Sequence, residues 1–172
     1  MFQKILVPLD GSRMAAAVLP KVAELAAAMN AQVTLIHVCS RHAPVRSGKG
    51  SPGGIKAPAA PEAKFCAGFM TAGCKGLEEQ GLRVDWVCRA GSPALTIITY
   101  AQENEYDLIF LGTHGQGDVA WSLGNVAEKV STHATVPVLL FQTLKMKPPL
   151  LKDKMAKLFR EAGLYIGWTL PH

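Results

Sequence analysis

The fold is decided by the stretch KILVPLDGS at residues 4–12. Its apolar run Ile5-Leu6-Val7 predicts a buried strand, and the Pro, Asp, Gly and Ser that follow predict a tight turn. Residues 14–29 are rich in helix formers, with Ser12 as the expected N-cap and Pro20 as an expected kink or break. Residues 32–38 are rich in β-branched side chains, which favours a second buried strand. Together these segments predict one βαβ unit.

The same alternation continues along the chain. We expect helices at residues 62–80, 93–105 and 124–133, and strands at residues 82–88, 107–111 and 137–141. Gly81 is expected to close the first of these helices, and Ser92 and Pro93 are expected to begin the second as N-cap and first helical residue. Parallel strands require crossover connections of this kind. The sequence therefore predicts an α/β fold, a doubly wound five-stranded parallel sheet covered by helices on both faces.

Two segments interrupt or follow this pattern. Residues 40–61 are dense in Gly, Pro and Ser and are expected to be a long flexible loop. Residues 145–172 hold five Lys and one Arg against two acidic residues, a net charge of +4 out of the chain's +5. Their apolar residues recur at helical spacing, which predicts a basic amphipathic helix. We expect one domain at residues 1–144 and a C-terminal extension at residues 145–172.

Composition narrows the classes of partner and compartment. Residues 1–144 carry a net charge of only +1, which argues against a nucleic-acid partner. The chain has neither an apolar run of membrane-spanning length nor an N-terminal signal pattern, so we expect a cytoplasmic protein. Its four cysteines lack zinc-ligand spacing and are expected to be thiols in buried or half-buried positions. Its histidines are scattered as well, so no metal site is predicted.

Two segments at predicted strand ends hold residue types that could bind a ligand. Asp10 follows the first strand, and a run containing Gly112, Gly115, Gly117 and Gly124 follows the fourth. Ligands of doubly wound sheets bind beyond the carboxyl ends of the strands where the strand order reverses, and a glycine backbone can aim its N–H groups at phosphate oxygens there. We place the switch point between these two strands. The alternatives are that the glycines serve tight turns and that Asp10 caps a helix.

The chain resembles the universal stress protein family in four separate segments. They are KILVPLDGS at residues 4–12, DLIFLGTHG at 107–115, GNVAEKV at 124–130 and VPVLL at 136–140. The resemblance spans about residues 1–142. It implies an adenine nucleotide alpha hydrolase-like fold with strand order 3-2-1-4-5. It also implies a stress-response regulatory protein that binds ATP or another adenine nucleotide, with Mg²⁺ as a companion of ATP.

The resemblance also assigns site residues and an assembly. Pro8, Leu9 and Asp10 would flank adenine and ribose, and Val38 would meet adenine through its backbone. The phosphates would be held by Gly112, Thr113, Gly115, Gly124, Asn125 and Val126. The family further implies a homodimer through the fifth strand, residues 136–141, and the C-terminal tail would pack on its own domain or on the partner subunit.

The glycine loop departs from the family pattern at two points. Eight residues separate Gly115 from Gly124 where the pattern has nine, and Asn125 stands where the pattern has Ser or Thr. The candidate ligands are therefore ATP, ADP, AMP and adenosine. Two other functions stay open, a dimeric scaffold that binds no nucleotide and a slow ATP hydrolase. No catalytic residue is assigned, because His114 has no partner that the sequence identifies and residues 112–125 contain no Lys or Arg.

Overall fold

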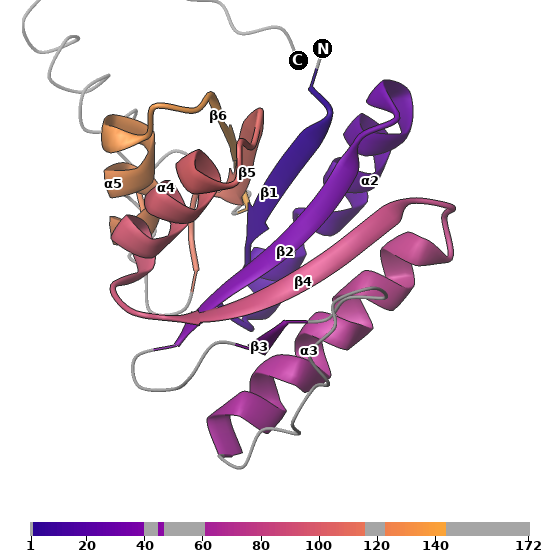
Figure 1. Cartoon of the computed structure of the whole chain (residues 1–172), viewed down its shortest axis with the longest axis horizontal. Coiled ribbons are helices and arrows are strands. Elements are labelled where there is room, and N and C mark those ends of the chain that lie inside the picture. The colour runs from indigo at the N-terminus through magenta and orange to yellow at the C-terminus, as the bar shows by residue number, and fades with distance from the viewer. Residues whose placement is uncertain (1, 40–44, 47–60, 116–122, 144–172) are drawn as a thin grey trace, which may run out of the picture.

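The structure is a computed structural model that describes residues 2–39, 45–46, 61–115 and 123–143 (Figure 1). Helices and strands alternate along most of the chain. They are, in order, β1 (Lys4–Pro8), α1 (Arg13–Ala16), α2 (Leu19–Met29), β2 (Gln32–Cys39), β3 (Val45–Arg46), α3 (Pro61–Glu78), β4 (Arg83–Ala90), α4 (Pro93–Glu103), β5 (Leu108–Gly112), α5 (Asn125–His133) and β6 (Val138–Phe141).

The strands form one sheet in the order β3-β4-β2-β1-β5-β6. The five longer strands run parallel, and their order is the predicted 3-2-1-4-5. The two-residue β3 pairs antiparallel with the outer edge of β4, with Val45 opposite Cys88. This short strand corrects the expectation that residues 40–61 lack regular structure. Pro61, expected in the loop, begins α3 instead, and residues 40–44, 47–60 and the predicted C-terminal helix lie outside the described residues.

Alternate residues of each strand build two separate cores. In β1, Ile5 and Val7 face α1, α2 and α3, whereas Leu6 faces α4 and α5. Figure 1 shows α3 on one side of the sheet and α4 and α5 on the other. Both faces are covered because parallel strands are joined by helical crossovers, which explains why the strands are almost continuously apolar. Each fully buried aliphatic side chain contributes about 1.5–3 kcal/mol to this packing.

The predicted first helix is broken into two pieces. Helix α1 ends at Ala16 and α2 begins at Leu19, with Pro20 in its first turn, where a missing N–H is tolerated. Ser12 caps α1 as predicted, since its side chain accepts a hydrogen bond from the N–H of Ala15. Ser92 is the N-cap residue of α4 and Pro93 its first residue, as predicted, although the Ser92 side chain makes no cap hydrogen bond.

Two of the four cysteines form a disulfide, so the expectation that all four are thiols is wrong. Cys66 of α3 is bonded to Cys88 of β4, whereas Cys39 and Cys74 keep buried thiols. Burial raises the pKa of the Cys74 thiol to about 12, with smaller contributions from the charges of Glu78 and Asp85. The pairing follows from the packing of α3 against β4, which spacing in the sequence does not record.

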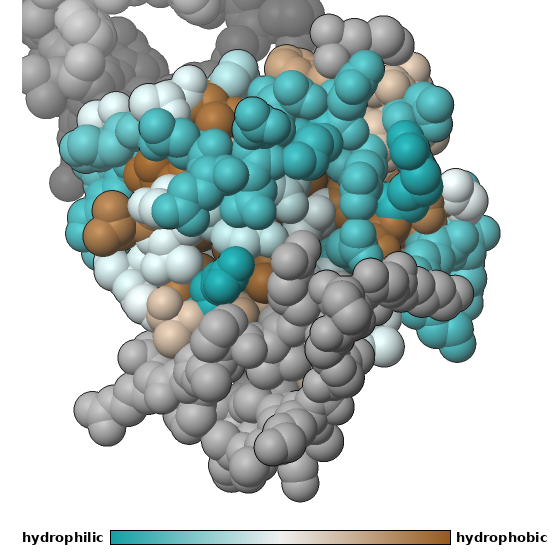
Figure 2. Space-filling model, in the orientation of Figure 1, coloured by the Kyte–Doolittle hydropathy of each residue, from teal (hydrophilic) through white to brown (hydrophobic). Residues whose placement is uncertain are grey.

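The described surface offers no sign of a membrane-spanning element. Among the described residues, no helix combines the length and the apolar character that a bilayer crossing requires. In the view of Figure 2 the described surface is largely hydrophilic, and its apolar residues form separate small patches.

Candidate functional site

The strand order reverses beside β1. The chain passes from β1 outward to β2 and β4, then returns to the other side of β1 with β5, where Ile5 and Leu6 align with Leu108 and Ile109. The switch point therefore lies between β1 and β5, as predicted. Because parallel strands end at the same edge of the sheet, the turn after β1 and the glycine loop after β5 lie at one edge.

The turn after β1 fixes the position of Asp10. Its Oδ1 accepts a hydrogen bond from the backbone N–H of Ser12 at 2.8 Å, and Gly11 between them has a φ of +84°. Such a positive φ suits glycine, because a side chain there would be strained. Capping of α1 falls to Ser12, so the alternative of Asp10 as the helix cap is not what the structure shows.

Pro8, Leu9 and Val38 come from the neighbouring ends of β1 and β2. Pro8 aligns with Ile36, and the N–H of Leu9 donates to the Ile36 carbonyl at 2.8 Å. Val38 lies two residues beyond Ile36 and is half-buried. Asp10 follows β1 in the turn, so Val38 and Asp10 both lie just beyond the last paired residues of the two strands.

Backbone hydrogen bonds join the two ends of the glycine loop. The N–H of Thr113 donates to the Phe141 carbonyl at 2.9 Å, and the N–H of Gly124 donates to the Thr113 carbonyl at 2.8 Å. The first bond continues the pairing of β5 with β6, and the second brings the end of β5 to the start of α5. Gly112, Thr113 and Gly115 are half-buried, and residues 116–122 between the two ends lie outside the described residues.

Gly112 is required by packing within the chain. A Cβ at this position would lie 2.7 Å from Cγ2 of Thr143, a distance that real Cβ atoms do not adopt. At Gly112 the space that the sequence suggested for a ligand is therefore taken by the side chain of Thr143, which follows β6. At Gly112 it is this packing contact, and neither a ligand nor a tight turn, that the structure shows.

The start of α5 is suited to an anion. Gly124 is its N-cap residue and makes no side-chain cap bond, and Asn125 and Val126 are its first two residues. Asn125 is exposed and does not cap the helix. The first N–H groups of a helix have no intrahelical partner and carry the positive end of its dipole, so they attract phosphate or carboxylate oxygens.

His114 belongs to the same edge although the sequence assigned it no role. Its side chain is buried, and its Nδ1 lies 2.9 Å from Oγ1 of Thr113. Its Nε2 has no hydrogen-bond partner among the described residues. Buried polar atoms are almost always paired, so this nitrogen is a candidate contact for a bound ligand. The only signal in the sequence was its place between Thr113 and Gly115.

Ten residues predicted for the site thus come from four segments of one sheet edge. Three follow or end β1, one lies near the end of β2, three follow or end β5, and three begin α5. They are Pro8, Leu9, Asp10, Val38, Gly112, Thr113, Gly115, Gly124, Asn125 and Val126. The arrangement offers a carboxylate at one side and an uncapped helix start at the other, which suits a ligand with hydroxyl groups and an anionic end.

This doubly wound sheet with its switch point between β1 and β5 is the adenine nucleotide alpha hydrolase-like fold. The sequence profile of the universal stress protein family matches residues 1–142. The chain belongs to the universal stress protein family.

Known relatives match over most of this chain and nearly all of theirs. The universal stress protein YxiE of Bacillus subtilis is 32% identical over 148 residues, 81% of this chain and 99% of that protein. A universal stress protein solved in complex with cAMP has a TM-score of 0.64 and 19% identity, covering 83% of this chain and 98% of that one. The protein MJ0577 has a TM-score of 0.64 and 25% identity, covering 86% of this chain and 99% of that one.

Proposed function

We propose that this protein binds an adenine nucleotide at the switch-point edge and acts as a homodimeric regulatory protein of the stress response in the cytoplasm. The observation that carries the proposal is the start of α5, whose N-cap residue is a glycine without a side chain, at the same edge as the Asp10 carboxylate. Members of this fold have been solved with cAMP, dAMP and AMP, at 19%, 21% and 16% identity to this chain. Those ligands belong to those proteins and are extended to this chain by the proposal alone.

The nucleoside would lie against the ends of β1 and β2. The Asp10 carboxylate would accept hydrogen bonds from ribose hydroxyls, and its orientation is already fixed by the bond from Ser12. Pro8 and Leu9 would flank the base, and the Val38 backbone would contact adenine. A site that is ordered before binding loses less conformational entropy when the ligand arrives.

The phosphates would lie across the glycine loop. Backbone N–H groups of Asn125 and Val126 would donate to phosphate oxygens, with Gly112, Thr113, Gly115 and Gly124 lining the loop. Mg²⁺ would accompany ATP by bridging its phosphate oxygens. Asn125 lacks the hydroxyl of the family pattern, so the number of phosphates is the part of the proposal that only a comparison of ligands can decide.

Calorimetric titration with ATP, with ATP and Mg²⁺, and with ADP, AMP and adenosine tests the proposal. Asp10→Asn should weaken binding of every ligand about tenfold or more, because it removes a charged hydrogen-bond acceptor worth roughly 1.5–3 kcal/mol. Asp85→Asn is the matched control, since Asp85 lies in β4 and bonds to Gln32 instead. Absence of binding at millimolar concentrations of all ligands would contradict the proposal.

A scaffold without nucleotide is the second candidate. It is favoured by two contacts in which site residues serve the chain itself, Gly112 against Thr143 and Asp10 with Ser12. Mass spectrometry of small molecules released from freshly purified, denatured protein separates the two functions. A bound adenine nucleotide would exclude a scaffold that binds no nucleotide. Catalysis is not part of the proposal. Hydrolysis of ATP by the purified wild type that is lost in Asp10→Ala would instead show a nucleotide hydrolase.

The dimer would form through β6, which is the edge strand of the sheet next to β5. Its four residues, Val138–Phe141, are all half-buried, and an edge strand has backbone groups that a second chain can pair with. Light scattering of the whole protein and of a variant ending at residue 144 tests this assembly. Retention of the dimer mass by the shorter variant would place the interface on the strand, whereas a monomer would place it on the tail.

A further inference from the structure

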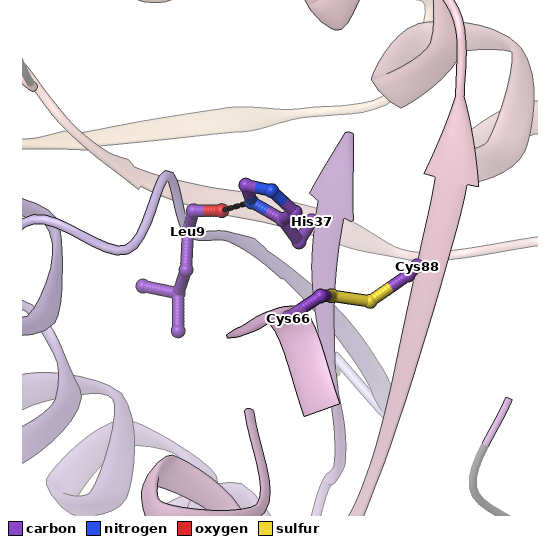
Figure 3. Close-up of a disulfide and its surroundings, with 4 residues drawn as sticks. All are labelled: Leu9, His37, Cys66 and Cys88. Atoms are coloured by element: carbon purple, nitrogen blue, oxygen red, sulfur yellow. Dashed lines mark hydrogen bonds between the residues drawn. A yellow bond between two sulfur atoms is a disulfide. The ribbon is translucent and has the colours of Figure 1, made fainter. Parts of the chain in front are cut away.

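A cluster of metal-ligating side chains lies on the α3 side of the sheet. His37 and Cys39 are two residues apart in β2 and therefore point to the same face, and Cys66 approaches them from α3. One ligand atom from each of the three residues lies within 4.8 Å of the other two. Cys88 of β4 is aligned with His37 and is bonded to Cys66 (Figure 3).

The chemistry of these donors selects zinc. Imidazole nitrogen and thiolate sulfur are the ligands of structural zinc sites, with Zn–N and Zn–S distances of about 2.0–2.3 Å. A tetrahedral site with those bonds places its donors roughly 3.3–3.8 Å apart. Donors already within 4.8 Å reach that spacing through side-chain adjustments of about 1 Å. Hard cations such as Mg²⁺ prefer oxygen ligands, which this cluster does not supply.

The hydrogen bond of His37 prepares its ring for coordination. Its Nδ1 lies 2.8 Å from the carbonyl oxygen of Leu9, and a carbonyl only accepts, so Nδ1 carries the proton (Figure 3). In this tautomer Nε2 carries the lone pair and is the ring nitrogen that can bind a metal ion. Histidine ligands of metals characteristically donate their other ring N–H to a backbone carbonyl in this way. The ring is also held edge-on against Phe69, with the ring centroids 5.1 Å apart.

The sulfur atoms are shielded from water. Cys39, Cys66 and Cys88 are exposed by only 9%, 0% and 3% of their surface. Buried thiolates are unfavourable without a compensating cation, so reduction of the disulfide leaves a set of donors that a metal ion stabilises. Disulfides of the cytoplasm are mostly transient and redox-sensitive, which agrees with a pair that opens and closes.

We propose that the reduced protein binds Zn²⁺ through His37, Cys39 and Cys66, with Cys88 as the fourth ligand, and that disulfide formation releases the ion. A dithiol reductant supplies two electrons and two protons, which convert the Cys66–Cys88 bond to two thiols while the reductant closes to its own disulfide. Zn²⁺ then displaces one proton from each of the three thiols that bind it. The absence of ligand spacing in the sequence does not exclude the site, because its donors come from three elements.

Zinc uptake by the whole protein in its two redox states tests the proposal. Protein reduced with a dithiol and then freed of reductant under inert gas should take up one equivalent of Zn²⁺, which a colorimetric chelator measures after denaturation. Protein with the intact disulfide should take up none. Co²⁺ in place of Zn²⁺ should give thiolate charge-transfer bands and the visible bands of tetrahedral coordination. Equal uptake in both states, no uptake by reduced protein, or an octahedral cobalt spectrum would each overturn the proposal.

Variants identify the ligands. Cys39→Ser, Cys66→Ser and His37→Asn should each weaken zinc binding at least about tenfold in chelator competition. The Asn amide can still donate to the Leu9 carbonyl, so the last variant removes the ligand and keeps the hydrogen bond. Cys74→Ser is the matched control, because Cys74 is also a buried thiol of α3 but lies outside the cluster. Unchanged affinity in the three ligand variants, or an equal loss in the control, would overturn the assignment.

Cys88→Ser separates the metal site from the disulfide. This variant cannot form the Cys66–Cys88 bond, so it should bind Zn²⁺ without prior treatment with reductant, more weakly than the reduced wild type. Circular dichroism of each variant establishes that it is folded. A folded Cys88→Ser protein that bound no zinc would contradict the three-residue core of the site.

Discussion

At the scale of single residues, Asp107 shows how one carboxylate joins distant parts of the chain. Its Oδ2 accepts hydrogen bonds from the N–H groups of Gln3 and Lys4, both at 2.8 Å, just before β1 and β5 run side by side. These backbone hydrogen bonds, that of Gln3 first, hold the pKa of Asp107 below its ordinary value of 3.8. The carboxylate therefore stabilises the beginning of β1.

Asp107→Asn should lower the free energy of unfolding by about 1 kcal/mol at neutral pH, because a partly exposed, charged acceptor is replaced by a neutral one. A depressed folded-state pKa gives stability that is complete above the unfolded value and is lost as pH falls through the folded value. The difference between wild type and variant should thus shrink as pH falls below 3.8. Urea denaturation across that range measures it, and a difference independent of pH would contradict the assignment.

Gly112 provides a second prediction at this scale. Gly112→Ala should destabilise the protein by about 1–3 kcal/mol, since the new Cβ would meet Cγ2 of Thr143 at 2.7 Å. Thr143→Ser removes that methyl group and keeps the hydroxyl, so the double variant should recover most of the loss. Thermal unfolding of the two single variants and the double variant measures the coupling. Simple additivity would show that Thr143 is not the obstacle.

At the scale of elements, the helix starts differ in how their N–H groups are paired. The Ser12 side chain caps α1, the Ser92 side chain makes no cap bond at α4, and α5 begins at Gly124 without one. Ser12 and Ser92 look alike in the sequence. Whether a serine makes the cap bond depends on its side-chain torsion, which neighbouring packing sets. Gly124 has no side chain with which to cap α5, so the sequence itself shows that this cap is missing, and only its place beside the switch point is a structural result.

Ser12→Ala should lower stability by about 1 kcal/mol, the usual effect of losing a cap, and Ser92→Ala should leave it nearly unchanged. The two substitutions are chemically identical, so each is the control of the other. Chemical denaturation of both variants gives the comparison. Equal losses would mean that the hydroxyl of Ser12 does not act as the cap.

At the scale of the whole molecule, the Cys66–Cys88 disulfide ties α3 to β4. Its two cysteines are 22 residues apart, and closing a loop of this size restricts the unfolded chain by about 3 kcal/mol. The same side of the sheet carries His37, whose ring bonds to the Leu9 carbonyl at the edge of the candidate site. His37 therefore lies between the side of the sheet that holds the disulfide and the candidate site.

Reduction in the presence of a metal chelator should lower the free energy of unfolding by about 3 kcal/mol. The chelator matters, because zinc binding by the reduced protein would restore part of the stability. Cys88→Ser should show no effect of the reductant, and Cys74→Ser should respond like the wild type. Denaturation curves with and without reductant measure the effect, and a wild type insensitive to reduction would contradict the linkage.

Much of the fold followed from local patterns. The apolar runs of β1 and β5, the Pro and Gly residues at their ends and the alternation with helices predicted the parallel sheet and its switch point. The edge position of Asp10 and of the glycine loop followed as well, because strand ends are set by the sequence next to them. These features depend on neighbours along the chain, which a sequence displays directly.

Contacts between elements were decided by the tertiary structure alone. The disulfide, the obstacle of Thr143 at Gly112, the pairing of β3 with β4 and the approach of Cys66 to His37 all join residues far apart in the chain. Each depends on how elements distant in the chain are placed against one another, which one sequence does not state. The sequence by itself determined the sheet and the position of its switch point, because both follow from local patterns, whereas the packing determined which residues at that edge, such as Gly112, make contacts within the fold.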